Sequence, residues 1–412
     1  MRIVFASLTK QLVGGTESYL KAALHQFSQK HEMAFVYAEG SDLLSTLSDN
    51  EINLGPDSKS KIPNVKAFRV KNSDQNSGIE WVKNWNPDVI VNNGVQRTEF
   101  VKSLATKFPT VFFPHDYYAT CISGTKFNRR THSECLSAFG YGCLIKYHLL
   151  GCGGKSPITM WRNFRKVQEF HSYFPLYSRV VCVSEHMRQE MIREGISKEK
   201  IDVLPYFPSG FLQLSLPPVP REFTNRLLFM GRLVSLKGWR DAIQAVRLAS
   251  IRLQRPLVLD LAGDGPDRSA LDQIASENPG LVKVHGKLDT QQSIDLLAKV
   301  DCLLVPSRWA EPYGKVGLEA ATQGVPTIAY NVGGMSEWLK DGETGFFVGK
   351  GDLTPAGLAA KICEIYSNPD RWNTIRTNAW QFSSPLTLDN HMEHFFVSLE
   401  KAKDFFNSNK LK

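Results

Sequence analysis

The hydrophobic residues of this chain fall into short runs that alternate with stretches of helical periodicity. In the first half, apolar runs occupy residues 2–7, 34–37, 88–91, 110–113 and 179–184. Continuous apolar runs of this length are typical of strands that are buried on both faces of a sheet. A helical pattern covers residues 18–27 and lies between two of these runs. The first half therefore predicts strands and helices that alternate around a parallel sheet.

A second alternation of the same kind follows a proline-rich segment at residues 205–222. Proline interrupts both helices and strand ladders, so this segment is typical of a linker. Beyond it, we expect strands at residues 227–230, 258–262, 282–285, 302–306, 327–330 and 346–348, and a long amphipathic helix at 388–406. The pattern predicts an α/β fold with two Rossmann-like domains that face each other across a cleft, with ligands at the carboxyl ends of the strands. The expected boundaries are 1–207, a linker at 208–222, 223–385, and 386–412 for the terminal helix.

Composition and cysteine content narrow the class of protein. The chain has 412 residues, of which 42% are hydrophobic and 22% charged, so we expect a globular protein of more than one domain. No apolar stretch approaches the roughly 18 residues that span a bilayer, and the first residues lack the pattern of a secretory signal. The seven cysteines have no regular spacing, which favours free thiols over a disulfide framework. We therefore expect a cytosolic protein.

Positive charge is concentrated in one part of the chain. Residues 101–200 carry 15 Lys and Arg against 7 Asp and Glu, whereas the remainder is balanced at 34 of each. This excess favours an anionic partner, which would be a lipid-linked phosphate, an acidic glycan, a membrane surface or nucleic acid. A solvated basic face without a dedicated partner explains the excess equally well. Nucleic acid is the weaker specific alternative, because no zinc-finger spacing, RNP-like strand or basic heptad helix accompanies the charge.

Glycines and cations follow several of the predicted strands. Gly14 and Gly15 precede the first helix, where backbone N–H groups can bind an anion, although a tight turn explains a glycine pair equally well. Arg232 and Lys237 come after the first strand of the second half and form a suitable pair for a diphosphate. Surface salt bridging is the alternative for either cation alone. A Gly-Asp-Gly turn at 263–265 is compatible with a plain loop.

The segment 306–348 holds the most specific pattern. In EPYGKVGLEA, Pro312 is expected to start a helix whose first backbone amides stay accessible because of Gly314. Glu311 and Glu319 are eight residues apart, a rise of about 12 Å on a helix, whereas glycosidase carboxyl groups lie roughly 5 to 9.5 Å apart. The spacing favours two carboxylates that hold the two ends of one elongated ligand, with Glu319 on the hydroxyls of a ribose. An ordinary amphipathic helix with two exposed glutamates is the alternative.

These motifs occur in the order found in one family of enzymes. The chain resembles the retaining glycosyltransferases of family 4, which have the GT-B fold, and the resemblance covers nearly the whole chain, weakly in residues 38–80 and 117–175. It implies that the C-terminal domain binds a nucleotide sugar, that the N-terminal domain binds the acceptor, and that the last helix crosses back to the N-terminal domain. The segments that carry it are GGTE at 14–17, HD at 115–116, VCVSEHMRQEM at 181–191, GRLVSLKG at 231–238, AGDGP at 262–266 and the E-x7-E of EPYGKVGLEA.

The resemblance also implies roles for individual residues. Arg232 and Lys237 would bind the diphosphate and stabilise charge on the departing phosphate, Glu311 would contact the donor sugar, and Glu319 would hold the ribose. His115 would reach the transferred sugar from the other domain, although a lone histidine is also compatible with a structural role. The other implied donor contacts are Gly15, Tyr313, Gly314 and Lys315 at the sugar and phosphate, and Gly263, Gly286 and Lys287 at the base. The implied acceptor contacts are Gly14, Gly15, Glu17, His115 and Asp116.

The implied reaction transfers a sugar with retention from a UDP-sugar or GDP-sugar to a glycan or lipid-linked glycan, which gives an α-linkage. A front-face route, in which the leaving phosphate helps to take the acceptor proton, suits a site without an evident protein nucleophile. The sequence has no D-x-D motif, so we expect no cofactor and no divalent metal. Bacterial surface polysaccharide biosynthesis is the implied context. The alternatives are a GT-B enzyme that epimerises or hydrolyses the nucleotide sugar, and a non-catalytic protein that binds an anionic surface.

Residues 117–160 form an insert that departs from the family pattern. Without any C-x-x-C pair, its cysteines favour buried thiols or a redox-sensitive pair over a structural zinc site. The insert is also basic, and aromatic residues continue from it into 160–166. This mixture is compatible with a membrane surface that carries a lipid-linked acceptor, and equally with a lid over a soluble acceptor. The residues concerned are Cys121, Cys135, Cys143, Cys152, His132 and His148, with Lys126, Arg129, Arg130, Lys146 and Lys155.

Overall fold

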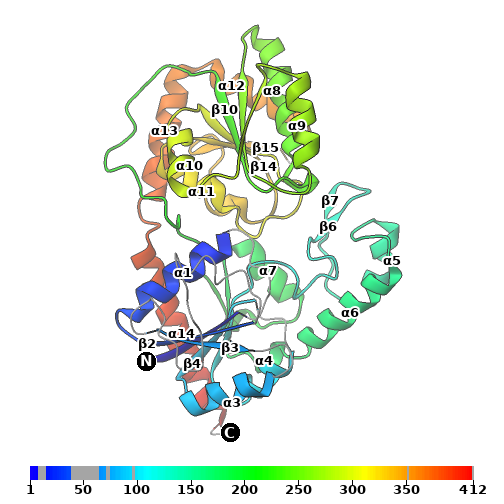
Figure 1. Ribbon diagram of the computed structural model, residues 1–412, viewed down its shortest axis with the longest axis vertical. Helices are drawn as coiled ribbons and strands as arrows, with labels where there is room; N and C mark the ends of the chain where they lie inside the picture. Colours follow the sequence, from blue (N-terminus) through cyan, green and yellow to red (C-terminus); the bar gives the residue numbers. More distant parts are fainter. Residues whose placement is uncertain (8–14, 39–64, 71–74, 95–97, 350–351, 411–412) are drawn as a thin grey trace. The chain divides into compact units, whose positions relative to one another are not determined.

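The chain forms two compact units, each built around its own parallel sheet (Figure 1). The computed structural model describes residues 1–7, 15–38, 65–70, 75–94, 98–349 and 352–410. Unit 1 comprises Met1–Thr131, Cys135–Pro205 and Leu388–Lys412, and unit 2 comprises His132–Glu134 and Tyr206–Thr387. The two parallel α/β sheets predicted from the apolar runs are therefore confirmed.

The sheet of unit 1 has the strand order β3-β2-β1-β4-β5-β8-β9, and the paired strands are parallel. Its central strands are apolar on both faces because helices cover the sheet, as the continuous runs predict. The strands are β1 (Arg2–Ser7), β2 (Glu32–Ala38), β3 (Val65–Val70), β4 (Val89–Asn92), β5 (Thr110–Phe112), β8 (Arg179–Cys182) and β9 (Ile201–Val203).

The helices of unit 1 connect these strands in sequence order, with one long excursion between β5 and β8. That excursion contains the basic insert, two short strands, β6 (Phe127–Asn128) and β7 (Ser133–Glu134), and two helices. The helices of the unit are α1 (Gly15–Ser28), α3 (Gln75–Trp85), α4 (Thr98–Ala105), α5 (Gly142–Leu149), α6 (Pro157–His171), α7 (Glu185–Arg193) and α14 (Leu388–Lys410), with 3-10 turns at Phe174–Leu176 and Lys198–Lys200.

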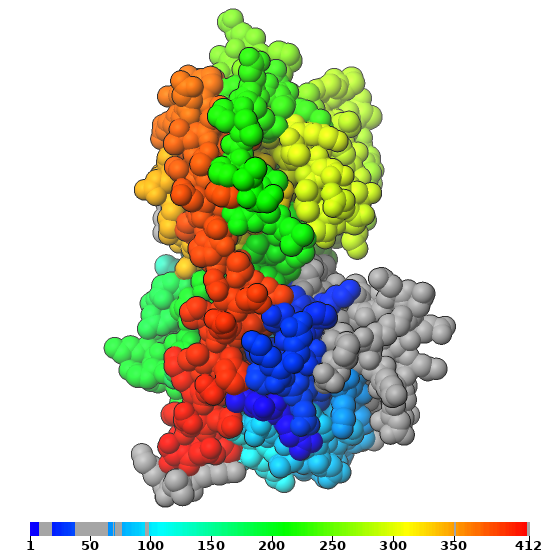
Figure 2. Space-filling model, turned by 90° about the vertical axis from the view of Figure 1, so that its left-hand side faces the viewer, coloured from blue at the N-terminus to red at the C-terminus, as the bar shows by residue number. Residues whose placement is uncertain are grey.

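The C-terminal helix α14 completes the core of unit 1. Figure 2 shows α14, in red, lying along α1, in blue. The ring of Phe395 is fully buried and lies 6.1 Å from that of Phe5, 5.8 Å from Phe27 and 5.4 Å from Phe113, measured between ring centroids. The predicted return of the last helix to the first domain is therefore confirmed, because these aromatic contacts join the two ends of the chain in one core.

Unit 2 has a six-stranded sheet in the order β12-β11-β10-β13-β14-β15, and its paired strands are parallel. Its strands are β10 (Arg226–Met230), β11 (Val258–Ala262), β12 (Val282–Gly286), β13 (Cys302–Val305), β14 (Thr327–Tyr330) and β15 (Gly345–Val348). Its helices are α8 (Trp239–Leu253), α9 (Arg268–Glu277), α10 (Thr290–Leu297), α11 (Lys315–Thr322), α12 (Pro355–Tyr366) and α13 (Pro369–Ser383), with 3-10 turns at Ser235–Lys237 and Gly333–Glu337.

The proline-rich segment predicted as a linker, 208–222, is bound to unit 2. The Gln213 amide donates a hydrogen bond to the Trp380 carbonyl oxygen, with 2.7 Å between the two atoms. The Arg376 guanidinium donates to the Val219 carbonyl oxygen at 2.8 Å. Proline lacks a backbone N–H donor, so this segment is held to α13 by hydrogen bonds that involve side chains instead of by a strand ladder.

Replacing Phe395 with alanine should destabilise unit 1 by about 3–5 kcal/mol, because it leaves a cavity among three aromatic rings. The matched control is Val397→Ala on the same helix, where the side chain is 46% exposed and the loss should stay within about 0.5 kcal/mol. Urea unfolding of the full chain measures both changes. Equal losses for the two variants would contradict the role of Phe395.

Candidate active site

A partly buried ion pair lies at the carboxyl ends of β10 and β13 in unit 2. The Lys237 Nζ atom is 2.5 Å from the Oε1 atom of Glu311, and the Ser307 hydroxyl donates to the same oxygen at 2.6 Å. The Glu311 residue is only 5% exposed. The Lys237 ammonium also lies 5.3 Å from the ring centroid of Trp309, a cation–π contact. Lys237 is therefore held in one position by a carboxylate, which a hydroxyl group supports in turn.

Glycines allow the loops that carry this ion pair to approach one another. Gly238 follows Lys237 with φ +72°, and a Cβ atom there would lie 1.9 Å from the carbonyl oxygen of Pro306. Gly333 has φ +58°, and a Cβ atom there would lie 2.2 Å from the carbonyl oxygen of Glu311. The next amide, Gly334 N–H, donates to that oxygen at 2.7 Å. A larger residue at Gly238 would force apart the two loops that carry Lys237 and Glu311, and one at Gly333, in the loop after β14, would displace the backbone of Glu311.

Arg232 lies in the same β10–α8 connection as Lys237, and its side chain is exposed. No ion pair or side-chain hydrogen bond of Arg232 is present in the described part of the chain. The connection thus provides one cation that is held by a carboxylate and one that faces solvent. Two cations five residues apart at a strand end suit the bridging oxygens of a diphosphate.

The neighbouring strands β11 and β12 end in glycines that bring three backbones together. A Cβ atom at Gly263 would lie 1.9 Å from the Gly231 carbonyl oxygen, and one at Gly265 would lie 2.6 Å from the Leu233 carbonyl oxygen. The Gly263 N–H donates to the Gly286 carbonyl oxygen at 2.7 Å. Gly263 and Gly286 therefore meet at the ends of β11 and β12. Lys287 follows with an exposed side chain.

Helix α11 begins later than its sequence predicts. Pro312 does not start the helix; Gly314 caps it with φ +80°, and Lys315 is the first helical residue. The left-handed conformation of Gly314 ends the preceding loop and leaves the first backbone amides without a side-chain cap. Because Glu311 lies in the loop and Glu319 on the helix, the expected rise of eight helical steps between them is wrong.

Burial dominates the ionisation of Lys315 and Glu319 on the first turns of α11. The Lys315 Nζ atom lies 3.7 Å from the Glu319 Oε1 atom and 3.0 Å from the Ser209 hydroxyl. Burial lowers the pKa of Lys315 and raises the pKa of Glu319, and their mutual attraction opposes both shifts without cancelling them. A pair at this distance compensates its desolvation incompletely, so a further polar partner would stabilise the charged forms.

The side chain of Tyr313 packs in the interior of unit 2, and its main-chain carbonyl oxygen accepts a hydrogen bond from another residue. Its ring is buried against Tyr206, with 5.4 Å between the ring centroids, and its hydroxyl donates to the Tyr206 carbonyl oxygen at 3.5 Å. The Trp338 Nε1–H donates to the Tyr313 carbonyl oxygen at 2.6 Å. Any ligand contact of Tyr313 is therefore expected from its backbone N–H group.

In unit 1, His115 and Asp116 follow β5 as predicted. The His115 Nε2 atom lies 2.5 Å from the Asn93 Oδ1 atom, and its ring packs between those of Phe113 and Tyr19. Asp116 accepts a hydrogen bond from the Tyr118 N–H at 2.9 Å. Burial raises the pKa of Asp116 to about 6, although this hydrogen bond lowers it.

The remaining acceptor residues lie at the start of α1. Gly15 is the first residue of that helix. Gly14 lies outside the described residues, as does the side chain of Glu17. Their proposed contacts therefore stay predictions.

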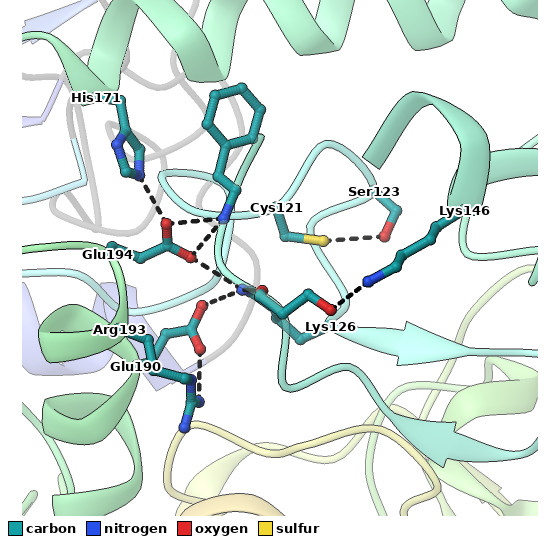
Figure 3. A network of polar contacts seen from close by, with 10 residues as sticks. Cys121, Ser123, Lys126, Lys146, His171, Glu190, Arg193 and Glu194 are labelled. Carbon is teal, nitrogen blue, oxygen red and sulfur yellow. Dashed lines mark hydrogen bonds and ion pairs between the residues drawn. The ribbon is translucent and has the colours of Figure 1, made fainter. Parts of the chain in front are cut away.

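The insert has a buried polar core that the sequence does not indicate. Figure 3 shows the Lys126 ammonium between the carboxylates of Glu190 and Glu194. Glu190 lies on α7, and Glu194 is the residue that ends this helix. Burial by itself lowers the pKa of Lys126, but the two carboxylates outweigh it and raise the pKa. Lys126 is thus an internal cation, and its assignment to the basic surface of the insert is wrong.

The cysteines of the insert are thiols. All seven cysteines of the chain are free in the structure, with Cys121, Cys135 and Cys143 half-buried and Cys152 buried. Burial raises the pKa of Cys152 to about 11, and it also raises the pKa of Cys143. Among the described residues no group of three or more His, Cys, Asp or Glu side chains is arranged to hold a metal ion. The expectation that no metal is needed stays a prediction.

Ser307 and Trp309 belong to the site and were missed by the sequence reasoning. Both lie in the PSRWAEP segment that was singled out for its glutamate. A serine and a tryptophan at a strand end do not by themselves indicate a site. Ser307 contacts Glu311 and Trp309 contacts Lys237, and the second contact depends on a loop that is distant in sequence.

Two family models match the chain. Glycosyltransferase Family 4 matches residues 13–207 and Glycosyl transferases group 1 matches residues 218–382, so that together they span both units. The chain belongs to the group 1 and family 4 glycosyltransferases. The predicted GT-B fold and the membership of this glycosyltransferase family are therefore confirmed.

Curated relatives of this glycosyltransferase match parts of it. A glycogen synthase of Mycobacterium tuberculosis is 36% identical over 153 residues, which cover 36% of this chain and 36% of the relative. An uncharacterised 41.2 kDa protein of the cps region of Klebsiella pneumoniae is 29% identical and covers 50% of this chain and 57% of the relative. The capsular polysaccharide glycosyltransferase CapM of Staphylococcus aureus is 26% identical over 48% of this chain and 55% of its own. The chain thus matches between 36% and 57% of the length of these relatives.

Solved structures share the fold of this glycosyltransferase over nearly its whole length. HepE of Anabaena in complex with UDP has a TM-score of 0.69 at 19% identity, covering 97% of this chain and 100% of that one. The sucrose-phosphate synthase of Thermosynechococcus elongatus has a TM-score of 0.66 at 16% identity, covering 96% of this chain and 97% of that one. At identities of 19% and 16%, these similarities establish the fold alone. In the described part of the glycosyltransferase, no helix combines the length and apolar character needed to cross a membrane.

The raised pKa of Asp116 predicts a pH-dependent stability. Because the folded state holds this proton more tightly than the unfolded state, the stability it contributes is present below the unfolded value of 3.8 and is lost as the pH rises through about 6. Asp116→Asn keeps the acceptor for the Tyr118 N–H and should therefore stabilise the chain by about 1–3 kcal/mol at neutral pH. Thermal unfolding between acidic and neutral pH measures this gain, which should disappear near pH 4. A gain that is independent of pH would refute the assignment.

Proposed function

We propose that this glycosyltransferase transfers a sugar with retention from a UDP-sugar or GDP-sugar to a glycan or lipid-linked glycan, forming an α-linkage. The observation that carries the proposal is the Lys237–Glu311–Ser307 cluster beside the exposed Arg232, at the carboxyl edge of a parallel sheet. Ligands of such sheets bind at this edge. The same edge also presents the glycine-rich backbones of β11 and β12.

In the proposed reaction the bond between the anomeric carbon and the phosphate oxygen breaks, and its electrons stay on the leaving nucleoside diphosphate. Arg232 and Lys237 would neutralise this charge from fixed positions, which lowers the barrier more than mobile solvent does. The Lys237 ammonium has three N–H donors and uses one for Glu311, so it can bind phosphate oxygens without losing its orientation. The acceptor hydroxyl bonds to the anomeric carbon on the same face, and its proton passes to the leaving phosphate.

The rest of the donor would bind along the neighbouring loops. We assign the sugar and phosphate to Glu311 and to the backbone amides at Tyr313, Gly314 and Lys315, where the uncapped start of α11 favours anions. Glu319 would hold the ribose hydroxyls, which would add hydrogen bonds to a carboxylate that burial now disfavours. Gly263, Gly286 and Lys287 would contact the base, mostly through backbone groups.

Unit 1 would supply the acceptor contacts and further sugar contacts. His115, which Asn93 orients, is proposed to contact the transferred sugar, and Asp116 to contact the acceptor. Gly14, Gly15 and Glu17 are proposed as further contacts at the start of α1. These roles follow from the family motifs at these positions.

The comparisons support the substrate class. HepE was crystallised with UDP, with UDP and glucose, and with UDP-glucose, and CapM is described as a capsular polysaccharide glycosyltransferase. We propose on this basis a nucleotide-sugar donor and a role in bacterial surface polysaccharide biosynthesis, at the cytoplasmic face of the membrane. No metal or cofactor is required in this proposal.

Arg232→Ala should lower sugar transfer by about 10²-fold to 10³-fold, the usual loss when one preorganised charge is removed. Its side chain is exposed, so the fold should be unchanged. The matched control is Arg252→Ala, an exposed arginine at the end of α8 that should leave transfer unchanged. Release of UDP or GDP from a panel of nucleotide sugars measures the rates. Near-wild-type transfer by Arg232→Ala would contradict the proposal.

Lys237→Ala should lower transfer at least as far, and it should also destabilise unit 2, because Glu311 is left buried without its cation. The double variant Lys237→Ala with Glu311→Gln should recover stability without recovering activity. Thermal unfolding and the transfer assay together separate the two effects. Recovery of transfer by the double variant would contradict the proposed roles of both Lys237 and Glu311.

Retention and the need for an acceptor are tested on the product. NMR of the new glycosidic bond should give the anomeric configuration of the donor, and inversion would refute the retaining mechanism. Consumption of the nucleotide sugar should require an acceptor. Equal consumption without any acceptor would favour an epimerase or hydrolase.

A further inference from the structure

We propose that α5 and α6 of the insert form a docking surface for an anionic lipid bilayer, made by Tyr141, Ile145, Leu149, Ile158 and Trp161 and the basic side chains around them. This goes beyond the transfer reaction, and it concerns a surface of unit 1 that none of the proposed substrate contacts uses.

Helix α5 exposes an apolar stripe. Tyr141, Ile145 and Leu149 are 71%, 69% and 59% exposed. They are four residues apart and therefore follow one face of the helix. The opposite face is already used, because Tyr147 and Leu144 pack into a cluster with Ile122, Phe164 and Val167. The exposed stripe is thus an additional apolar face of a helix that has a core face of its own.

Helix α6 continues this surface. Ile158 is 71% exposed and Trp161 is 50% exposed. Tyr141 and Trp161 both contact the buried ring of Phe164, with centroid distances of 5.5 Å and 5.8 Å. The two exposed aromatic residues therefore flank one ring, and the stripes of α5 and α6 meet there. Exposed Trp and Tyr beside aliphatic residues are typical of surfaces that enter the headgroup region of a bilayer.

The charge around this surface indicates which occupant it suits. Residues 117–171, which include all of α5 and α6, contain eight Lys and Arg but two acidic residues, Glu134 and Glu169. Lys126 is internal, but six of the cations are exposed: Arg129, Arg130, Lys155, Arg162, Arg165 and Lys166. Arg162 and Arg165 are one and two turns beyond Ile158 on α6, and the Arg130 guanidinium donates to the Leu149 carbonyl oxygen at 3.0 Å at the end of the α5 stripe.

An apolar stripe with a rim of cations matches anionic lipid, where the acyl boundary takes the apolar side chains and the headgroups take the cations. A second copy of this chain is the less suitable occupant, because an isologous contact would bring two clusters of like charge together.

The buried ion pairs of the insert make this surface a fixed platform. As Figure 3 shows, the carboxylate of Glu194 binds Lys126 and His171. The Glu194 carboxylate also accepts a hydrogen bond from the Phe139 N–H at 2.9 Å, and the His171 Nε2 atom, at the end of α6, lies 3.0 Å from it. The Lys126 ammonium donates to the Ser137 carbonyl oxygen at 2.8 Å, and Lys146 of α5 donates to the Ser137 hydroxyl. Segments before α5, α5 itself and α6 are thus joined to the end of α7. These contacts hold α5 and α6 in an arrangement in which their apolar side chains stay exposed to solvent.

Co-sedimentation of the full-length chain with vesicles tests the proposal without any nucleotide sugar. We expect binding to vesicles of phosphatidylglycerol mixed with phosphatidylcholine, and little binding to phosphatidylcholine alone. Raising the salt concentration from about 0.1 M to about 0.5 M NaCl should weaken the binding, because the charges become screened. Equal binding to both vesicle types, or none to either, would overturn the proposal.

Two variants with matched controls separate the apolar and the charged contributions. Ile145→Ser should weaken vesicle binding about tenfold, whereas Ile251→Ser on α8, at 68% against 69% exposure, should not. Arg162→Ala with Arg165→Ala should weaken it by about fivefold for each charge removed. Arg252→Ala with Lys283→Ala removes the same charge from unit 2 and should have no effect. Similar losses for variants and controls would show nonspecific attraction and overturn the assignment to α5 and α6.

Self-association is the outcome that favours the second copy. If analytical ultracentrifugation shows a dimer that Ile145→Ser dissociates while vesicle binding is absent, the surface is an interface between copies and the lipid proposal is wrong. UDP binding by calorimetry should be the same for Ile145→Ser and the wild-type chain. A failure of vesicle binding with normal sugar transfer would leave the proposed reaction intact, and the reverse result would leave the docking surface intact.

Discussion

The ion pair between Lys237 and Glu311 depends on backbone approaches that only glycine allows. Gly238 brings the loop after β10 close to the loop after β13, and Gly333 brings the loop after β14 close to Glu311, so that a Cβ atom at either glycine would overlap a carbonyl oxygen. This approach lets a carboxylate buried in one loop hold an ammonium from another. A lysine fixed in this way is a preorganised positive charge, and the neighbouring Arg232 adds a second one. The chemistry of the site therefore rests on loop geometry at one edge of the unit 2 sheet.

The insert also contains a cation that carboxylates hold in a fixed position. Lys126 is enclosed by Glu190 and Glu194, and this network joins the insert to α7 through groups that are nearly inaccessible to solvent. Losing one partner would leave a buried charge uncompensated, so the network specifies one arrangement of the insert. In both units, then, an internal ion pair fixes the segments that carry the proposed donor site and the proposed docking surface.

The hydrophobic periodicity of the sequence predicted most of the fold. Glycines and charged residues at strand ends indicated much of the candidate site. Strands such as Val258–Ala262 and Thr327–Tyr330 match their apolar runs, whereas β3 and β9 were missed, because one alternates with polar residues at a sheet edge and the other is three residues long. The role of Ser307 and the burial of Lys126 were not predictable, since each depends on contacts between segments that are distant in sequence. The prediction that Pro312 starts the helix was wrong for a local reason. Gly314 adopts a left-handed conformation and caps the helix, so that α11 begins at Lys315 despite the preference of proline for the first helical turn.

A crystal structure of the full chain with a nucleoside diphosphate tests the central claim most directly. The account predicts that the phosphate oxygens lie within hydrogen-bond distance of the Lys237 ammonium and the Arg232 guanidinium, with Glu311 still bound to Lys237. A nucleotide found elsewhere in the molecule, or phosphates held without either cation, would contradict it.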